Sequence, residues 1–215
     1  MNQKNLISNL EKKGVLAVVT INDLEKTNYI CDALLNGGIS MIELTLRTDN
    51  AFKIINHISK NYADIIVGAG TILSITQLEK AIESGASFGV APGIDPNVIE
   101  ESKKLNFTFA PGICTPSDIQ QALSYNLNLL KFFPAEYSGG LDYLKSISAP
   151  FIQNDLKFIP LGGININSAI KYLHSNLVVA IGGSWIANNS LIDESNWREI
   201  EKRANEMHKL VATVR

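Results

Sequence analysis

The sequence predicts an α/β protein that folds as one (β/α)8 TIM barrel with an additional N-terminal helix. Short runs rich in β-branched residues alternate with longer amphipathic segments along the 215-residue chain, which is the pattern of repeated βα units. Eight strand-like runs occur, and eight strands close a barrel of this kind. No Ser/Gly-rich linker interrupts the alternation, so we expect residues 1–215 to form a single domain.

The predicted elements alternate in a regular order. The strands are expected at residues 15–20, 40–46, 64–70, 86–91, 107–111, 128–133, 156–161 and 177–182. The helices are expected at about 23–36, 49–61, 75–84, 95–104, 116–125, 140–148, 167–174 and 193–212. A further helix at about 3–12 is expected to close the bottom of the barrel.

Capping residues mark several of the predicted helix boundaries. Asn22-Asp23, Asp95-Pro96 and Thr115-Pro116 place a side-chain oxygen before a first turn, and proline is tolerated at the first helical position. Asn36-Gly37-Gly38 and Ser84-Gly85 supply the glycine that favours a left-handed helix C-cap.

A doubly wound open sheet is the competing architecture, because it also alternates strands and helices. A dinucleotide-binding sheet places G-x-G-x-x-G after its first strand, whereas here the first strand leads into Ile21-Asn22-Asp23. The G-x-G at Gly68-Ala69-Gly70 follows the third strand and lacks the third glycine. The glycine distribution therefore favours the barrel.

Composition excludes several classes of function. The chain is 46% hydrophobic and 19% charged with a formal net charge of −2, so we expect neither disorder nor nucleic-acid binding. The N-terminus lacks the apolar core of a signal peptide and no stretch is apolar enough to span a bilayer, so we expect a cytoplasmic protein without a membrane partner. Cys31 and Cys114 are expected to be reduced, and His57, His174 and His208 are too scattered to predict a metal site.

Lys131 is the most informative residue. It lies within an otherwise apolar strand-like run, residues 128–133, where desolvation favours the neutral amine, a nucleophile toward carbonyls. The alternatives are that the side chain extends to the surface or closes an ion pair. Alternation along the strand predicts that Leu130 and Phe132 face the helices, while Leu129, Lys131 and Phe133 point inward.

The second strand places three more polar side chains on an inward face. Its apolar face consists of Ile42, Leu44 and Leu46. Its other face carries Glu43, Thr45 and Arg47. The alternative is that Glu43 and Arg47 simply pair with each other. Together with an inward lysine, however, they provide an amine to attack a carbonyl, a carboxylate to move protons and a guanidinium to hold an anion, which suits Schiff-base chemistry on an oxo acid.

Glycines follow the last two predicted strands. Gly162-Gly163 comes after the seventh and Gly182-Gly183-Ser184 after the eighth, the position where many barrels bind phosphate through backbone N–H groups. The alternative is that these glycines only form tight turns. Two such pairs on adjacent strands favour a phosphate site.

These residues give the chain a resemblance to a known family over about residues 5–210. The matching segments are 37–39, 42–48, 67–71, 91–93, 111–113, 131–136, 162–164 and 181–185. In them the chain resembles the 2-keto-3-deoxy-6-phosphogluconate (KDPG) aldolase and 4-hydroxy-2-oxoglutarate (KHG) aldolase family of class I aldolases. The resemblance implies a barrel that is usually trimeric, needs no metal or other cofactor, and cleaves KDPG to pyruvate and glyceraldehyde 3-phosphate.

The resemblance also implies roles for individual residues. Lys131 matches the Schiff-base lysine, and Glu43 matches the general acid/base. The residues that match substrate-binding positions are Arg47 and Thr71 for the pyruvate carboxylate, Phe133 and Pro92 for the walls around the imine, and Gly162, Gly163, Gly183 and Ser184 for the phosphate end.

Two residues depart from the family's usual pattern. Leu161 stands where gluconate-type enzymes usually carry threonine, and Thr20 stands where many relatives carry arginine. The substrate alternatives are therefore 2-dehydro-3-deoxy-6-phosphogalactonate and unphosphorylated 4-hydroxy-2-oxoglutarate. An alternative of another class is a non-catalytic barrel that binds sugar phosphates, in which Lys131 would serve only as an ion-pair partner.

Overall fold

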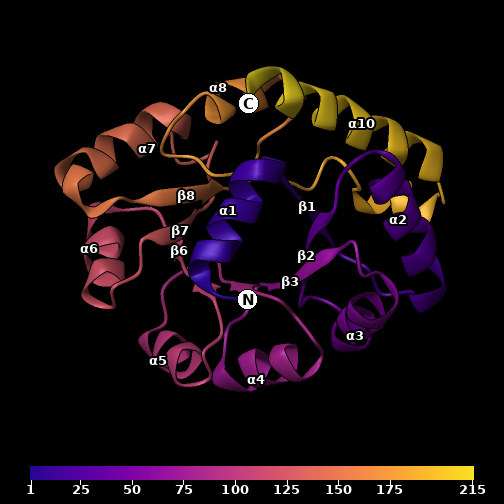
Figure 1. Cartoon of the computed structure of the whole chain (residues 1–215), viewed down its shortest axis with the longest axis horizontal. Helices are drawn as coiled ribbons and strands as arrows, with labels where there is room; N and C mark the ends of the chain where they lie inside the picture. The colour runs from indigo at the N-terminus through magenta and orange to yellow at the C-terminus, as the bar shows by residue number, and fades with distance from the viewer.

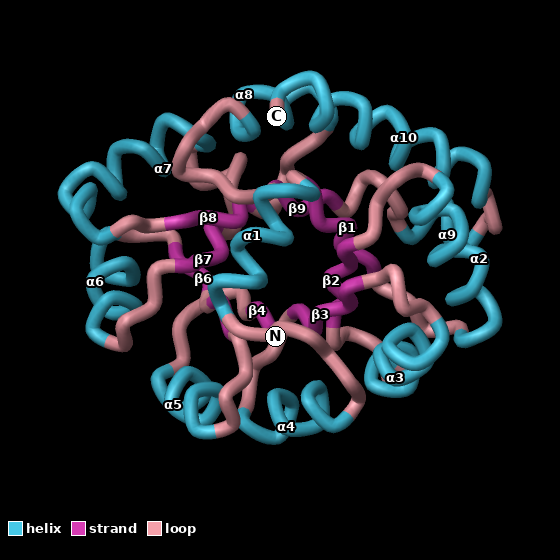
Figure 2. Tube along the Cα trace, in the orientation of Figure 1, coloured by secondary structure: helices cyan, strands magenta, loops and turns pink.

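The computed structural model describes residues 1–215 and shows parallel strands around a common centre with helices on the outside (Figure 1, Figure 2). The strands are β1 (Val15–Val19), β2 (Met41–Thr45), β3 (Ile66–Gly70), β4 (Gly89–Val90), β5 (Phe109–Ala110), β6 (Gly112–Ile113), β7 (Leu129–Phe132), β8 (Lys157–Pro160) and β9 (Ile181–Gly183). They form one sheet in the order β5-β4-β3-β2-β1-β9 and a second in the order β6-β7-β8.

The helices follow the strands as the βα pattern predicts. They are α1 (Gln3–Lys13), α2 (Leu24–Asn36), α3 (Ala51–Asn61), α4 (Ile75–Glu83), α5 (Pro96–Lys104), α6 (Pro116–Ser124), α7 (Gly140–Ser148), α8 (Ile166–Leu173), α9 (Asn189–Asp193) and α10 (Trp197–Val214). A 3-10 helix spans Ala149–Asn154. The predicted caps are present: Asp23, Asp95 and Thr115 each accept a hydrogen bond from the first turn of a helix.

Three predicted strands differ substantially from the structure. The fourth, expected at 86–91, is reduced to Gly89–Val90. The fifth, expected at 107–111, is divided into β5 and β6 because Pro111 has no N–H for a ladder; its carbonyl accepts from Lys131 N–H at 2.9 Å. The eighth, expected at 177–182, begins only at Ile181, because the Val178 N–H is used in a turn with the Ser175 carbonyl. A single bridge between Phe158 and Val178 links β8 to the segment before β9.

The end of the chain also differs from the prediction. One helix was expected at 193–212, but α9 ends at Asp193 and α10 begins at Trp197. Asn188 caps α9 by accepting a hydrogen bond from the Leu191 N–H, and Asn196 caps α10 by accepting from the Glu199 N–H. The missed helix α9 is important for the site, because its first residues line the cavity described below.

The apolar side chains form two separate cores. Alternate residues of a strand point to opposite faces, so a strand such as β7 contributes side chains to both cores. Leu130 and Phe132 belong to the larger core between strands and helices, as predicted. Leu129 belongs to a smaller core inside the ring of strands, together with Leu6 and Leu10 of α1. Helix α1 lies across the opening of the ring (Figure 1), and both of its leucines are fully buried. The inner core thus fills one end of the ring and leaves the other for polar groups.

No helix in the structure is both long and apolar enough to cross a membrane. The structure also contains no group of three His, Cys, Asp or Glu side chains arranged to hold a metal ion.

Replacing Leu10 with alanine should destabilise the fold by about 2–5 kcal/mol, because it removes buried methyl groups and leaves a cavity in the inner core. Urea unfolding monitored by circular dichroism measures this change. Ile152→Ala is the control, because Ile152 is 83% exposed and should change stability by less than about 0.5 kcal/mol. Equal losses in both variants would contradict the assignment of Leu10 to a packed core.

The buried Cys31 should resist alkylation in the folded protein. Burial raises the pKa of the Cys31 thiol to about 12, and the nearby Asp32 carboxylate adds to the shift. Since the thiolate is the reactive form, we expect iodoacetamide at mildly alkaline pH to leave Cys31 unmodified in the folded protein and to modify it in concentrated urea. Peptide mass spectrometry would contradict this expectation if Cys31 were alkylated equally fast in both states.

Candidate functional site

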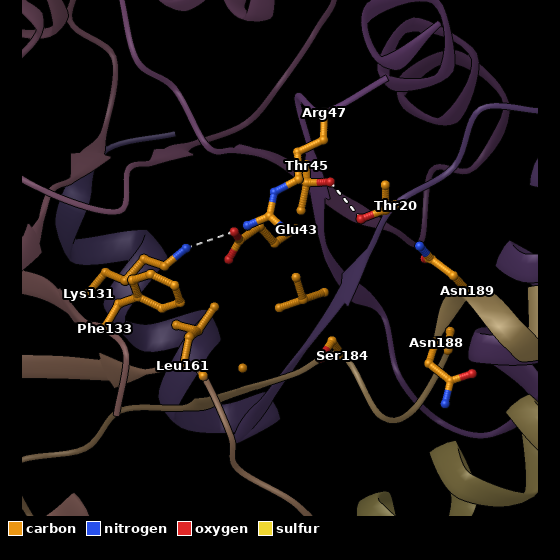
Figure 3. Close-up of a pocket in the computed structure, with 14 residues that line it drawn as sticks. Thr20, Glu43, Thr45, Arg47, Lys131, Phe133, Leu161, Ser184, Asn188 and Asn189 are labelled. Carbon is orange, nitrogen blue, oxygen red and sulfur yellow. Dashed lines mark hydrogen bonds and ion pairs between the residues drawn. The ribbon is translucent and has the colours of Figure 1, made fainter. Parts of the chain in front are cut away.

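Lys131 is buried inside the ring of strands and forms an ion pair with Glu43. The lysine comes from β7 and the glutamate from β2, and Lys131 Nζ donates a hydrogen bond to Glu43 Oε1 at 2.9 Å (Figure 3). The side chains are 6% and 1% exposed. Strand parity therefore placed both residues correctly on inward faces, and Lys131 does not extend to the surface.

Burying this pair is costly. Removing two charges from water carries a desolvation penalty that their mutual attraction offsets only in part, so such a pair adds little to stability. A buried ionisable pair at the edge of a cavity is typical of functional sites. The second carboxylate oxygen, Glu43 Oε2, is buried and has no hydrogen-bond partner. An unsatisfied buried acceptor costs free energy, so a water or substrate hydroxyl bound beside Oε2 would gain a hydrogen bond.

A cavity of about 390 Å³ opens beside this pair, which suits a small organic ligand. Its lining consists of Val18, Thr20, Glu43, Thr45, Arg47, Lys131, Phe133, Leu161, Gly162, Gly182, Ser184, Ala187, Asn188 and Asn189. Six residues predicted for the site are among them: Lys131, Glu43, Arg47, Phe133, Gly162 and Ser184. The structure thus brings together residues from both ends of the chain.

Four predicted substrate-binding residues lie outside this lining: Thr71, Pro92, Gly163 and Gly183. Thr71 directly follows β3 and has a left-handed backbone with φ of 63°, which is rare for a β-branched residue and marks a constrained position. Gly183 lies against the ring of Trp185. Contacts of these four residues with a substrate remain predictions from the family resemblance.

Arg47 points toward the same cavity as Glu43 (Figure 3) but does not pair with it. None of the six ion pairs of the chain includes Arg47. The expectation that Glu43 and Arg47 simply neutralise each other is therefore wrong, because the carboxylate turns to Lys131 instead. The Arg47 guanidinium is left to bind an anion, and a forked donor of this kind fits a carboxylate.

The walls around the amine are partly apolar. The ring of Phe133 lies with its centroid 5.4 Å from Lys131 Nζ, close enough for a favourable cation–π contact. Leu161 lies beside Phe133 in Figure 3, and its side chain packs against Gly182, where a Cβ would come within 2.3 Å of Leu161 Cγ. Such walls lower the local dielectric and strengthen the electrostatic interactions of the pair.

The far side of the cavity is polar but uncharged. Thr20 and Thr45 share a hydrogen bond of 2.8 Å between their hydroxyl oxygens, and Asn188 and Asn189 approach from the start of α9 (Figure 3). The two asparagines were missed because α9 was not predicted. The one signal in the sequence is Asn188, an N-cap residue type at the start of this segment.

This arrangement can carry out imine chemistry. A buried amine lies within hydrogen-bond distance of a carboxylate that can take its proton, and a separate guanidinium can orient a carboxylated substrate. The charged groups of the lining, Glu43, Arg47 and Lys131, gather on one side, where a 2-oxo acid would place its carboxylate and carbonyl together.

Comparison with known proteins agrees with this geometry. The profile of the KDPG and KHG aldolase family matches residues 6–203. The chain belongs to this family. It is accordingly an aldolase, and aldolases are carbon–carbon lyases. A protein from Haemophilus influenzae named 2-dehydro-3-deoxy-phosphogluconate aldolase is 33% identical over 208 residues, which cover 97% of each chain.

Two solved structures are similar over nearly the whole chain. KDPG aldolase from Legionella pneumophila, with pyruvate captured at low pH as a covalent carbinolamine intermediate, superposes with a TM-score of 0.88 at 33% identity, covering 93% of this chain and 96% of that one. The KDPG aldolase of Zymomonas mobilis with 3-phosphoglycerate gives a TM-score of 0.87 at 34% identity and covers 95% of both chains.

Removing one member of the buried pair should destabilise the protein, while removing both should not. Lys131→Met leaves the Glu43 carboxylate buried without a partner and should lower the free energy of unfolding at neutral pH by about 3 kcal/mol. Adding Glu43→Leu should recover most of this loss without restoring activity. Urea unfolding of the two variants tests this, and an equal or greater loss in the double variant would show that the pair itself stabilises the fold.

Proposed function

We propose that this aldolase cleaves KDPG to pyruvate and D-glyceraldehyde 3-phosphate through a Schiff base on Lys131. The observation that carries the proposal is the buried Lys131–Glu43 pair in the wall of a cavity that also contains Arg47. The Legionella structure supports it, because a carbinolamine is the adduct that precedes an imine between an amine and pyruvate. The imine itself serves as the electron sink, so the proposed reaction needs no metal or other cofactor.

The first half of the proposed reaction forms the imine. The Lys131 ammonium passes a proton to Glu43 or to water, and the neutral amine attacks the C2 carbonyl carbon. The resulting carbinolamine loses water and leaves a protonated imine. The partnerless Glu43 Oε2 is the atom placed to accept the hydrogen bond of a water or hydroxyl during these proton transfers.

The second half breaks the carbon–carbon bond. Glu43 takes the proton of the C4 hydroxyl, directly or through one water, and the C3–C4 electron pair moves toward the iminium nitrogen as the aldehyde departs. The remaining enamine takes a proton at C3 from Glu43. Water then attacks C2 and releases pyruvate, which returns the amine of Lys131.

The other predicted residues fit the substrate along the cavity. We assign Arg47 and Thr71 to the pyruvate carboxylate, and Phe133 and Pro92 to the walls beside the imine. The phosphate end is assigned to Gly162, Gly163, Gly183 and Ser184. This assignment is supported by the lining of the cavity for Arg47, Phe133, Gly162 and Ser184, and by the family resemblance for the others.

We further propose that residues 1–215 form one domain, a closed (β/α)8 barrel with α1 closing one end, and that the protein acts as a cytoplasmic homotrimer. The bridge between Phe158 and Val178 and the superposition on KDPG aldolases support closure. The trimer rests on the family resemblance, and the cytoplasmic location follows the expectation from the sequence. Light scattering would test the trimer.

The far side of the cavity carries no cation, which leaves room for a second candidate whose distal group is less highly charged than a phosphate, such as 4-hydroxy-2-oxoglutarate with its single distal carboxylate. The cationic groups of the lining, Lys131 and Arg47, both lie at the reacting end, so a phosphate would depend on backbone N–H groups and Ser184. A further candidate is 2-dehydro-3-deoxy-6-phosphogalactonate. Leu161 stands where gluconate-type enzymes usually carry threonine, and its side chain lies beside the reacting centre (Figure 3).

Treatment with pyruvate and borohydride should trap the imine as a stable mass adduct on Lys131. Lys131→Arg should abolish the adduct, because arginine stays protonated. Lys157→Arg is the matched control and should keep it, because Lys157 lies on the neighbouring strand β8 and pairs with Asp155. A folded wild-type protein without an adduct would contradict the aldolase mechanism and favour a barrel that only binds sugar phosphates.

A panel of purified acids should separate the candidate substrates. If backbone donors and Ser184 hold the phosphate, KDPG should be cleaved with kcat/KM at least roughly tenfold above that for unphosphorylated 4-hydroxy-2-oxoglutarate, since hydrogen bonds to a charged group contribute about 1.5–3 kcal/mol. Including the galactonate epimer measures the C4 preference. If either alternative acid is cleaved with a higher kcat/KM than KDPG, that acid is the substrate and the proposal of KDPG is wrong.

A further inference from the structure

Strand β3 carries two glycines on its inward face, and one of them lies directly under the Glu43 carboxylate. Gly68 pairs in register with Glu43, and Gly70 pairs with Thr45. A Cβ built on Gly70 would lie 2.2 Å from Glu43 Oε1, 2.5 Å from its Cγ and 2.7 Å from its carboxyl carbon. Real Cβ atoms essentially never approach another atom closer than 3.0 Å. The carboxylate therefore occupies the volume that any side chain at position 70 would need.

The backbone at position 70 does not itself require glycine. Gly70 is not among the residues with positive φ, whereas the next residue, Thr71, is. Alanine is therefore compatible with the local backbone conformation. The close approach of Glu43 explains why position 70 has no side chain, because no turn at this position requires glycine.

Displacing the carboxylate would break the arrangement that the proposed reaction needs. Glu43 is 1% exposed, so a side chain pushed off β3 cannot relax into bulk water. It must turn farther into the cavity, away from the position that holds Oε1 at 2.9 Å from Lys131 Nζ. Misplacement of a catalytic group by about 1 Å can cost on the order of a hundredfold in rate.

We propose that Gly70 is a positioning residue for Glu43: its missing side chain lets the carboxylate lie flat against β3, where one oxygen contacts Lys131 and the other faces the reacting atoms. This inference rests on the proposed role of Glu43 as general acid/base. Gly70 is not among the residues that line the cavity, and in this proposal it acts through Glu43.

Gly68 provides a matched control on the same strand. It also faces inward, but the volume above it is filled by the ring of Phe88, whose nearest atom would lie 2.3 Å from an added Cβ. Phe88 belongs to the inner apolar core. Gly68→Ala therefore overpacks the core of the same strand without pushing directly on the Glu43 carboxylate, and should cost stability of about 1–3 kcal/mol.

The test is a double-mutant cycle on KDPG cleavage with Gly70→Ala, Glu43→Ala, the double variant and Gly68→Ala. Gly70→Ala should lower kcat roughly a hundredfold, within the range general acid–base catalysis contributes, with KM changed less than about threefold. In the Glu43→Ala background the same substitution should change kcat less than about threefold, because no carboxylate remains to displace. Gly68→Ala should keep kcat within about threefold of wild type while lowering Tm.

A pH profile adds a readout that simple loss of packing would not move: the acidic limb of kcat/KM should shift in Gly70→Ala and stay in place in Gly68→Ala. Wild-type kcat in Gly70→Ala, or an equal loss in both backgrounds, would overturn the inference. If Glu43→Ala retains kcat, the proposed role of Glu43 fails instead. Should Gly70→Ala not fold, it is combined with Glu43→Ala and Lys131→Met, which together leave no unpaired buried charge; recovery of folding then supports the inference and failure to recover overturns it.

Discussion

The ion pair between Lys131 and Glu43 is the interaction on which the rest of the site depends. It joins β7 to β2 across the interior of the strand ring with a distance of 2.9 Å between Nζ and Oε1. By holding the carboxylate on the lysine side, it leaves the Arg47 guanidinium without an internal partner and Glu43 Oε2 without a hydrogen bond. The guanidinium can therefore bind the carboxylate of a substrate, and the free carboxylate oxygen can accept a proton from it.

The surrounding fold fixes the two halves of this pair. Helix α1 and the inner apolar core fill one end of the ring, so the polar groups collect at the other. The glycine at position 70 leaves the space in which the carboxylate lies, and the Phe133 ring borders the amine. Stability and function are opposed here. A buried ion pair with an unsatisfied oxygen adds little to the stability of the fold, but it is typical of groups that take part in a reaction.

Much of this could be predicted from the sequence, because period-two alternation decides which strand residues face inward. That rule placed Lys131 and Glu43 in the interior, and capping residues marked the starts of α2, α5 and α6. The partner of Glu43 could not be predicted, since Lys131 is 88 residues away and Arg47 is nearer in sequence. Helix α9 was missed because a five-residue helix has almost no periodicity, so its contribution to the cavity was missed with it.

A crystal structure of the protein soaked with pyruvate at low pH would test the central claim most directly. The account predicts continuous electron density from Lys131 Nζ to C2 of pyruvate, with the carboxylate on the Arg47 guanidinium and a water between the adduct and Glu43 Oε2. Pyruvate bound without a covalent bond to Lys131, with the Lys131–Glu43 ion pair unchanged, would contradict it.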